Sequence, residues 1–271
     1  FLTSDHVRLH YWFYDRGSDT VTIFLHGGPG HGTEDFRALQ AQDYADTFGS
    51  LFVFDQPGSG RSDTNPNLAP TITFNRFVKD IDELRNGLLG DHPVILLSRS
   101  FGGLLTAEYA NSQPETVVGY VLIAPGPFDA TVTESQRTVL REQVGSAFID
   151  QITREEREIV HGLYPPTNLN QESSDVEDVE EDTLDVGEAL RKNESFTEMN
   201  YYSLLDAMSD TPTLVVYGEY DTQVPPQSIE AMVPYFSSAQ FVSLVGNHLA
   251  GYAKQEELFK AIATFMSSQL K

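Results

Sequence analysis

The sequence contains no cysteine in its 271 residues. This absence excludes disulfide bonds, thiolate metal sites and a cysteine nucleophile, so covalent catalysis would have to use another side chain. No apolar run reaches the length of about 18 residues that a membrane-spanning helix needs. We therefore expect no membrane partner.

Basic residues are scarce. Lys and Arg number 17 against 40 Asp and Glu, which gives a formal net charge of −23. Binding to nucleic acid needs clustered Lys and Arg for phosphate contacts, so we expect no nucleic-acid partner. Such a charge repels itself and is best tolerated where salt screens it, and both a salt-adapted source and an ordinary acidic protein remain open interpretations.

The N-terminus has no basic segment followed by an apolar stretch, which is the pattern of a signal peptide. We therefore expect a cytoplasmic protein, although the sequence does not begin with Met. The sequence indicates no oligomeric state.

Short apolar runs alternate with helical patterns at both ends of the chain. The first run alternates in polarity, with Val7, Leu9, Tyr11 and Phe13 on one face, whereas most others are continuous and suit strands covered on both faces. Strands that alternate with helices predict an α/β fold with a mostly parallel sheet flanked by helices. The predicted strands are 7–13, 21–25, 51–54, 94–97, 118–123, 214–217 and 241–245, and the predicted helices are 35–47, 74–89, 101–112 and 256–267.

The alternation breaks between residues 129 and 209, where helical and polar patterns predominate. We expect helices at 134–151, 154–162 and 188–208. Between them, residues 172–188 carry nine acidic residues and no basic one, which is typical of a solvated loop or a frayed helix. The pattern predicts a helical cap at 129–209, inserted between the two core segments 1–128 and 210–271.

Ser100 lies in the most informative segment. Residues 93–103 read Pro-Val-Ile-Leu-Leu-Ser-Arg-Ser-Phe-Gly-Gly, so a buried strand runs into a sharp turn and then into a helix. A serine at such a turn projects its hydroxyl at the edge of the sheet and needs small residues two positions before and after it, here Ser98 and Gly102. The pattern resembles G-x-S-x-G with Ser98 in place of the first glycine. A purely structural serine, or Ser98 as the nucleophile within the strand, are the alternatives.

A glycine-rich turn, His26-Gly-Gly-Pro-Gly30, directly follows the predicted strand 21–25. Glycines there can turn backbone N–H groups toward a developing oxyanion, and Phe101, the residue after the nucleophile, would supply a second donor. We expect His26 to brace this loop and His31 to line the pocket.

The partners of a catalytic serine follow in the order Ser, Asp, His. Asp221 comes shortly after the predicted strand 214–217, and His248 follows the strand 241–245. His248 would accept the Ser100 proton while Asp221 holds its other ring nitrogen. Asp129, after the preceding strand, is the alternative acid, and an Asx turn is the structural alternative for Asp221.

Together, His26-Gly-Gly-Pro-Gly30 and Asp55-Gln-Pro-Gly-Ser-Gly-Arg-Ser62 resemble the prolyl aminopeptidase (proline iminopeptidase) branch of the α/β-hydrolases. The blocks Gly-Glu-Tyr-Asp221 and Gly-Asn-His248 also fit. The resemblance covers 21–130 and 213–271, and the cap matches only loosely. It implies the α/β-hydrolase fold, attack by Ser100 on the carbonyl of an N-terminal residue, often proline, and an oxyanion hole built from Gly28 and Phe101.

The same resemblance implies acidic residues that hold the free α-amino group of the substrate. In some members a Glu directly follows the catalytic Asp, whereas Thr222 stands there in this sequence. A cap glutamate is the other usual contributor. Glu194 is our first candidate and Glu198 the second, and solvated cap glutamates are the alternative interpretation.

These observations predict a serine hydrolase, an aminopeptidase that releases N-terminal residues, preferably proline, from short peptides through an acyl-enzyme. A carboxylesterase, amidase or lactonase that uses the same triad on a small uncharged substrate is the alternative. A non-catalytic member of the fold is a third interpretation, which the presence of all three triad residues disfavours. We expect no metal and no organic cofactor.

Overall fold

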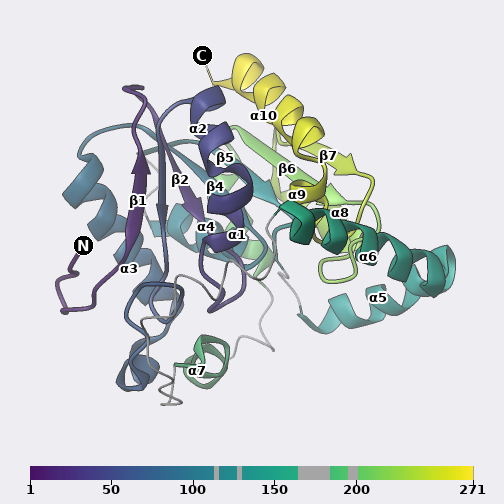
Figure 1. The fold of residues 1–271 in the computed structure, drawn as a ribbon, viewed down its shortest axis with the longest axis horizontal. Coiled ribbons are helices and arrows are strands. Elements are labelled where there is room, and N and C mark those ends of the chain that lie inside the picture. Colours follow the sequence, from purple (N-terminus) through teal and green to yellow (C-terminus); the bar gives the residue numbers. More distant parts are fainter. Residues whose placement is uncertain (113–115, 127–129, 164–183, 195–200, 271) are drawn as a thin grey trace.

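The computed structural model describes residues 1–112, 116–126, 130–163, 184–194 and 201–270. Their fold is a seven-stranded sheet with helices on both faces (Figure 1). In this part of the chain, no helix is both long and apolar enough to cross a membrane. The strands are β1 (Tyr11–Tyr14), β2 (Val21–Leu25), β3 (Leu51–Phe54), β4 (Val94–Arg99), β5 (Val117–Ile123), β6 (Thr213–Gly218) and β7 (Gln240–Leu244).

The strand order is β1-β3-β2-β4-β5-β6-β7, and only β1 runs antiparallel to its neighbour. All residues of β2 and β3 are buried, as expected for continuous apolar strands covered on both faces. The prediction of an α/β fold with a mostly parallel sheet is confirmed. Because parallel strands end at the same edge, the loops after β4, β6 and β7 are brought to one side of the molecule.

Two apolar cores lie on opposite faces of the sheet. Along β4, Val94 and Leu96 belong to one core, and Ile95 and Leu97 to the other, as the period of two along a strand requires. The helices α3 (Phe74–Leu84) and α4 (Phe101–Ser112) cover the first face, and α2 (Gln42–Phe48) and α10 (Gln255–Gln269) cover the second. Short helical turns extend several of them: α1 (Glu34–Phe36), Arg37–Ala41, Pro66–Thr71, Arg85–Leu89, α8 (Pro226–Glu230), Val233–Tyr235 and α9 (Ala250–Ala253).

The first strand begins later than predicted, at Tyr11 rather than at Val7. Val7 and Leu9 are fully buried in front of it, whereas Tyr11 and Phe13 remain 36% and 44% exposed at the margin of the sheet. Both exposed rings lie beside the ring of Phe52, at 5.2 and 6.1 Å. The alternating pattern therefore identified Val7 and Leu9 as buried but was wrong within the strand, where Trp12 and Tyr14 rather than Tyr11 and Phe13 pack against the core, and it missed the point at which pairing with β3 starts.

Between β5 and β6 the structure places α5 (Ala130–Val144), α6 (Ser146–Leu163), α7 (Val186–Asn193) and a 3₁₀ turn, Tyr202–Met208. In Figure 1, α5 and α6 lie together at the lower right and α7 lies apart at the bottom. These helices fall within the range 129–209 that we assigned to a cap, and the cap boundaries themselves stay a prediction.

All three predicted cap helices have different limits, and the break expected between 151 and 154 lies inside α6. The range 134–151 is split at Gly145, whose φ of +96° ends α5, because a residue in this backbone region terminates a helix. The range 188–208 is not one helix. Its first part, α7, starts earlier because the side chain of Asp185 accepts a hydrogen bond from the Glu188 N–H, and it ends at Asn193.

Most of the acidic stretch 172–188 lies outside the described residues. Its last part departs from the expected solvated loop or frayed helix. Leu184 and Val186 are buried, and both lie in the same core as β2 and α4. Asp185 and Glu188 are exposed. Asp185 caps the N-terminus of α7, and Glu188 forms an ion pair with Lys192 at 2.6 Å on the same helix.

The close approach of α4 to the end of β2 yields a stability prediction. A Cβ added to Gly102 would collide with the carbonyl oxygen of Leu25. Gly102→Ala should therefore lower the free energy of unfolding by about 1–3 kcal/mol, as overpacking does. Gly187→Ala is the control, because a Cβ there would lie 3.4 Å from its nearest neighbours and should be neutral or slightly stabilising. Urea titration of both variants checks this, and equal losses would contradict it.

Candidate active site

Ser100 occupies the turn between β4 and α4 with a φ of +50°, a strained conformation for any residue except glycine. Three hydrogen bonds hold its backbone N–H and C=O groups in place. The Ser100 N–H donates to Ile123 O at 3.0 Å, and its carbonyl accepts from the N–H groups of Gly103 at 2.8 Å and Gly126 at 3.0 Å. The turn thus presents the hydroxyl at the C-terminal edge of the sheet, as the sequence pattern predicted.

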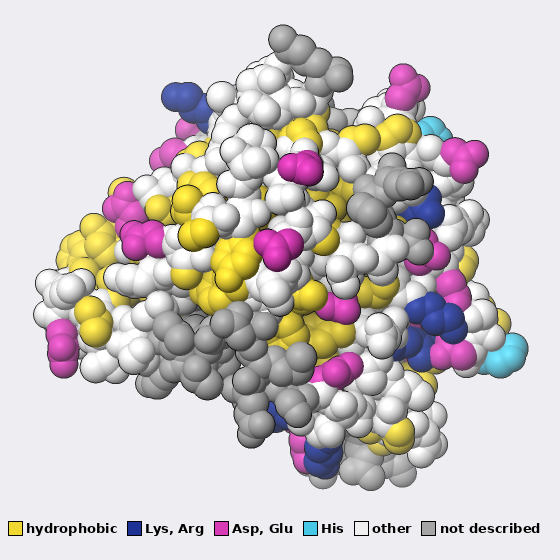
Figure 2. Space-filling view, turned by 180° about the vertical axis from the view of Figure 1, so that it is seen from behind, with side chains coloured by type: hydrophobic (Ala, Val, Ile, Leu, Met, Phe, Trp, Pro, Cys, Tyr) yellow, Lys and Arg dark blue, Asp and Glu magenta, His cyan; other side chains and the backbone are white. Residues whose placement is uncertain are grey.

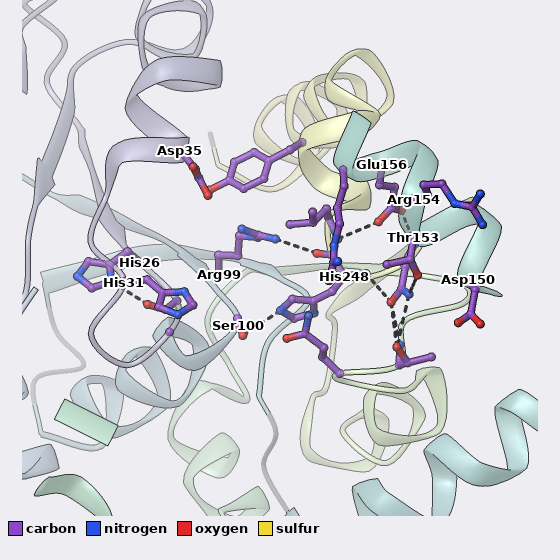
Figure 3. A pocket seen from close by; sticks show the side chains of 18 of the residues that line it. His26, His31, Asp35, Arg99, Ser100, Asp150, Thr153, Arg154, Glu156 and His248 are labelled. Atoms are coloured by element: carbon purple, nitrogen blue, oxygen red, sulfur yellow. Dashed lines mark hydrogen bonds between the residues drawn. The ribbon is translucent and has the colours of Figure 1, made fainter. Parts of the chain in front are cut away.

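The structure brings Ser100, His248 and Asp221 into one hydrogen-bonded chain (Figure 3). The Nε2 atom of His248 lies 3.1 Å from Ser100 Oγ, and its Nδ1 atom lies 2.8 Å from Asp221 Oδ2. Asp221 is completely buried and His248 nearly so. This arrangement can deprotonate the hydroxyl for attack on an acyl carbon, because the imidazole has an acceptor nitrogen toward Ser100 and a carboxylate behind it.

The carboxylate of Asp221 is oriented by its own loop. Its Oδ1 atom accepts the N–H groups of Gln223 at 2.7 Å and Val224 at 2.9 Å, which leaves Oδ2 for His248. The loops after β6 and β7 touch directly, since a Cβ on Gly218 would collide with the backbone of Asn247. Pairing of β6 with β7 therefore sets the distance between the acid and the histidine.

Glu156, on α6, anchors the histidine loop from both sides, and our sequence reasoning missed it. Its Oε1 atom accepts the Asn247 N–H and its Oε2 atom accepts the Leu249 N–H at 3.2 Å, so the carboxylate spans the two neighbours of His248. Burial raises the pKa of Glu156, which is only 5% exposed. A sequence signal existed, because Glu156 lies at helical spacing with the buried Ile149 and Val160.

Asn247 completes this connection. Its Oδ1 atom accepts the His248 N–H at 2.8 Å and the Thr222 N–H at 2.9 Å, and its Nδ2 atom donates to Thr153 Oγ1 at 2.6 Å. The side chain thereby ties the Asp221 loop, the His248 loop and α6 together. Thr222, the residue after Asp221, thus donates its backbone N–H to this amide.

The loop His26–Gly30 lies against the serine. A Cβ on Gly27 would stand 3.0 Å from the Cβ of Ser100, so glycine permits this close approach without displacing the serine. His26 braces the loop as expected, since its Nε2 atom accepts the Gln56 N–H at 3.0 Å and burial lowers its pKa. Gly28 lines the same cavity as Ser100, and Phe101 is the first residue of α4. Their roles as oxyanion donors stay a prediction.

The second glycine-rich motif supports the first. The carboxylate of Asp55 is fully buried; its Oδ1 atom accepts the Thr33 N–H at 2.9 Å and its Oδ2 atom accepts the Arg61 N–H at 2.9 Å. A Cβ on Gly60 would collide with this carboxylate. The motif around residues 55–62 therefore folds around an acid that also fixes the end of the His26 loop.

A cavity of 910 Å³ opens over Ser100 and extends to α6. Among the described residues its walls include Gly28, His31, Ser100 and His248, and Glu194 is not part of them. Ser98 is fully buried within β4, and its Oγ atom has no hydrogen-bond partner among the described residues. Asp129 and Glu198 lie outside the described residues. Within that same set, no three His, Asp or Glu side chains are placed to hold a metal ion.

Glu194 lies on another side of the serine turn, at the C-terminal end of α7. Its Oε1 atom accepts the Phe74 N–H at 3.2 Å, and the Phe74 ring packs 6.0 Å from that of Phe101. Burial, followed by the charges of Glu194 and Glu108, raises the pKa of Tyr201 to about 12. The predicted amine-binding carboxylate therefore lies beside Phe74, whose ring packs against that of Phe101, the residue after Ser100.

The double contact of Glu156 generates a prediction. In Glu156→Gln, the amide NH₂ group faces a backbone donor where a carboxylate oxygen stood, so the His248 loop should shift. Because misplacement of a catalytic group by about 1 Å can cost 100-fold in rate, we expect a fluorophosphonate probe to label Ser100 roughly 10- to 100-fold more slowly.

The control for this prediction is Glu158→Gln, an exposed position on the same helix. It should leave the labelling rate unchanged. Labelling of folded Glu156→Gln at the wild-type rate would show that the carboxylate contributes only to stability.

The model of the α/β-hydrolase fold family matches residues 21–252, most of the chain. A proline iminopeptidase of Saccharolobus solfataricus is 29% identical over 137 residues, which are 49% of this chain and 43% of that protein, less than half of its length. A proline iminopeptidase of Pestalotiopsis fici is 29% identical over 271 aligned residues, which cover 91% of each chain.

A solved structure agrees in fold. The crystal structure of a Mycobacterium smegmatis proline iminopeptidase superimposes with a TM-score of 0.72 at 20% identity, covering 99% of this chain and 97% of that one. At this identity the likeness concerns the fold alone. The chain belongs to the α/β-hydrolase fold family, and the resemblance of its sequence to the proline iminopeptidase branch is confirmed by these relatives.

Proposed function

We propose that the chain is a serine hydrolase, an aminopeptidase that releases N-terminal residues, preferably proline, from short peptides. The observation that carries the proposal is the continuous chain of hydrogen bonds from Asp221 through His248 to Ser100, at 2.8 and 3.1 Å. A nucleophile, a general base and an orienting acid in this geometry are the requirements of acyl transfer through serine.

In the proposed reaction, His248 Nε2 takes the proton of Ser100 Oγ as the oxygen attacks the substrate carbonyl. The N–H groups of Gly28 and Phe101 would stabilise the oxyanion. Collapse breaks the C–N bond, and the imidazolium of His248 gives its proton to the leaving amine. Water then attacks the acyl-enzyme with the same base, and release of the acid restores the Ser100 hydroxyl.

The aminopeptidase assignment is supported by the relatives, which are named proline iminopeptidases, and by the two glycine-rich motifs. The surroundings of Glu194 also favour it. A carboxylate beside the rings of Phe74, Phe101 and Tyr201 combines a negative charge for an α-amino group with apolar surface for a pyrrolidine ring.

A carboxylesterase, amidase or lactonase is the second candidate. The observation in its favour is Thr222, because the residue after Asp221 supplies no carboxylate to the cavity and instead donates its N–H to Asn247. Such an enzyme would use the same serine and histidine but would be indifferent to a free amine.

Hydrolysis of matched substrates separates the two candidates. Prolyl, alanyl and N-acetylprolyl anilides would be compared with a short-chain nitrophenyl ester. The proposal predicts the highest kcat/KM for the prolyl anilide and a large loss on N-acetylation, since acetylation removes the charge of the amine. Preferential ester turnover that does not depend on a free amine would assign the protein to the second class.

Ser100→Ala tests the nucleophile. Without the hydroxyl, no acyl-enzyme can form, and kcat for the best substrate should fall by roughly 10⁴-fold or more. Because alanine is smaller and sits in the same turn, folding should survive, and circular dichroism is the control. Turnover near the wild-type rate would exclude Ser100 as the nucleophile.

Glu194→Gln tests the amine site. Glutamine keeps an oxygen that can accept the Phe74 N–H, so the variant removes the charge and preserves the contact. We expect a several-fold higher KM for prolyl anilide with little change in kcat; Glu198→Gln is the parallel variant. Glu188→Gln, at an exposed position on α7, is the control. Unchanged KM in both Glu194→Gln and Glu198→Gln would contradict their role in binding the amine.

A further inference from the structure

The charge of the cavity is opposite to that of the chain. The whole sequence has 17 basic and 40 acidic residues, but the cavity above Ser100 is lined by four arginines and three acids. On the outer face in Figure 2, isolated acidic side chains are scattered among apolar and polar ones, and a few basic side chains lie among them toward one side. The lining arginines are Arg99, Arg141, Arg154 and Arg157, and the acids are Asp35, Asp150 and Glu156.

Two of the four arginines are already engaged. Arg141 pairs with Asp150 at 3.1 Å. Arg99 donates to the carbonyl of His248 at 2.9 Å and lies over the ring of Tyr252 at 4.1 Å. Both therefore support the walls of the cavity.

Arg154 and Arg157 are different. Neither guanidinium group makes a hydrogen bond or an ion pair with any residue that the structure describes, although acids outnumber bases more than twofold in the sequence. The acids beside them in the helix have other described contacts: Glu156 accepts the Asn247 and Leu249 N–H groups, Asp150 pairs with Arg141, and Glu155 accepts a hydrogen bond from Gln151. Within the part of the chain that the structure describes, the positive charges of the pair are thus available to a ligand.

The position of the pair relative to the serine is defined by α6. Figure 3 shows Arg154 on the same helix as Thr153 and Glu156, beyond His248 as seen from Ser100, His26 and His31, with its exposed side chain turned away from Ser100. Residues three apart on a helix are neighbours on its surface, so Arg154 and Arg157 form one cationic site on the α6 wall. A substrate whose carbonyl lies at Ser100 can extend along the cavity toward this wall.

We propose that Arg154 and Arg157 bind the free C-terminal carboxylate of a short peptide substrate. The inference rests on the proposed aminopeptidase function and adds to it the group at the other end of the substrate. Guanidinium groups hold carboxylates through paired N–H donors, and two of them on one wall give a carboxylate several donors at once. A peptide of two or three residues would then be held at its carboxylate and cut at its first bond.

Binding of the carboxylate should raise kcat/KM, and the increase should depend on the salt concentration. For a site that is partly open to water, we expect kcat/KM for a peptide acid to exceed that for its C-terminal amide by about tenfold. Added salt should reduce this ratio, because ions screen charges that are not fully buried. A neutral site would show neither effect.

The test compares prolyl-alanine with prolyl-alaninamide, which differ only in the carboxylate, on wild type and on the double variant Arg154→Gln/Arg157→Gln. The proposal predicts an acid-to-amide ratio of kcat/KM near ten for wild type and near one for the variant. Because the ratio compares two substrates on one protein, a general loss of activity in the variant does not affect it. Arg191→Gln, an exposed arginine outside the cavity, should keep the wild-type ratio.

Prolyl anilide carries the amine but no carboxylate, so it reports on the aminopeptidase function alone. If wild type cleaves the anilide but treats peptide acid and amide alike, the carboxylate site is refuted and the aminopeptidase function stands. A wild-type ratio that persists in the double variant likewise refutes the role of these two arginines. Failure to cleave the anilide and both peptides would refute the proposed function, and the carboxylate site with it.

Discussion

The candidate site depends on one steric constraint, the close approach of three backbone segments around Ser100. Gly102 lies against the carbonyl of Leu25, Gly27 against the Cβ of Ser100, and Gly103 against Pro125. A side chain at any of these glycines would separate the segments. Because Leu25 of β2 pairs with Ser98 of β4, the loop after β2 leaves the sheet directly beside the strand that leads to the serine. Sheet pairing therefore places the glycine-rich loop next to the nucleophile.

The same constraint explains why the serine can hold a positive φ. Its N–H and C=O groups are bonded to Ile123, Gly103 and Gly126, so relaxing the turn would break contacts on both neighbouring segments. The acid and the histidine are set by a second pairing, between β6 and β7. The core positions the three loops, and Glu156 of α6 then fixes the histidine loop. Docking of α6 is thus part of the geometry on which His248 depends.

Much of the core was predictable because its signals are local. Continuous apolar runs, a strand–serine–helix turn and the chain order of Ser100, Asp221 and His248 can be recognised without tertiary information. The start of β1 and the break at Gly145 were missed, because pairing partners and a helix end near a glycine depend on context. Helical spacing with Ile149 and Val160 distinguishes Glu156 from Glu155 and Glu158 as the inward-facing glutamate, but it does not indicate what the carboxylate binds. Its role appears only when α6 docks beside Asn247 and Leu249.

The net charge of the chain and the arginines of the cavity act on a substrate at different distances. A net charge of −23 favours the approach of cations and opposes that of anions, but salt screens exposed charges beyond about 8–10 Å. A short peptide carries both an ammonium and a carboxylate, so the field of an acidic chain assists one end and opposes the other. Arg154 and Arg157, in the wall of the cavity, can offset that opposition at contact distance. Local arginines of this kind would allow an acidic protein to accept a zwitterionic substrate without changing its overall charge.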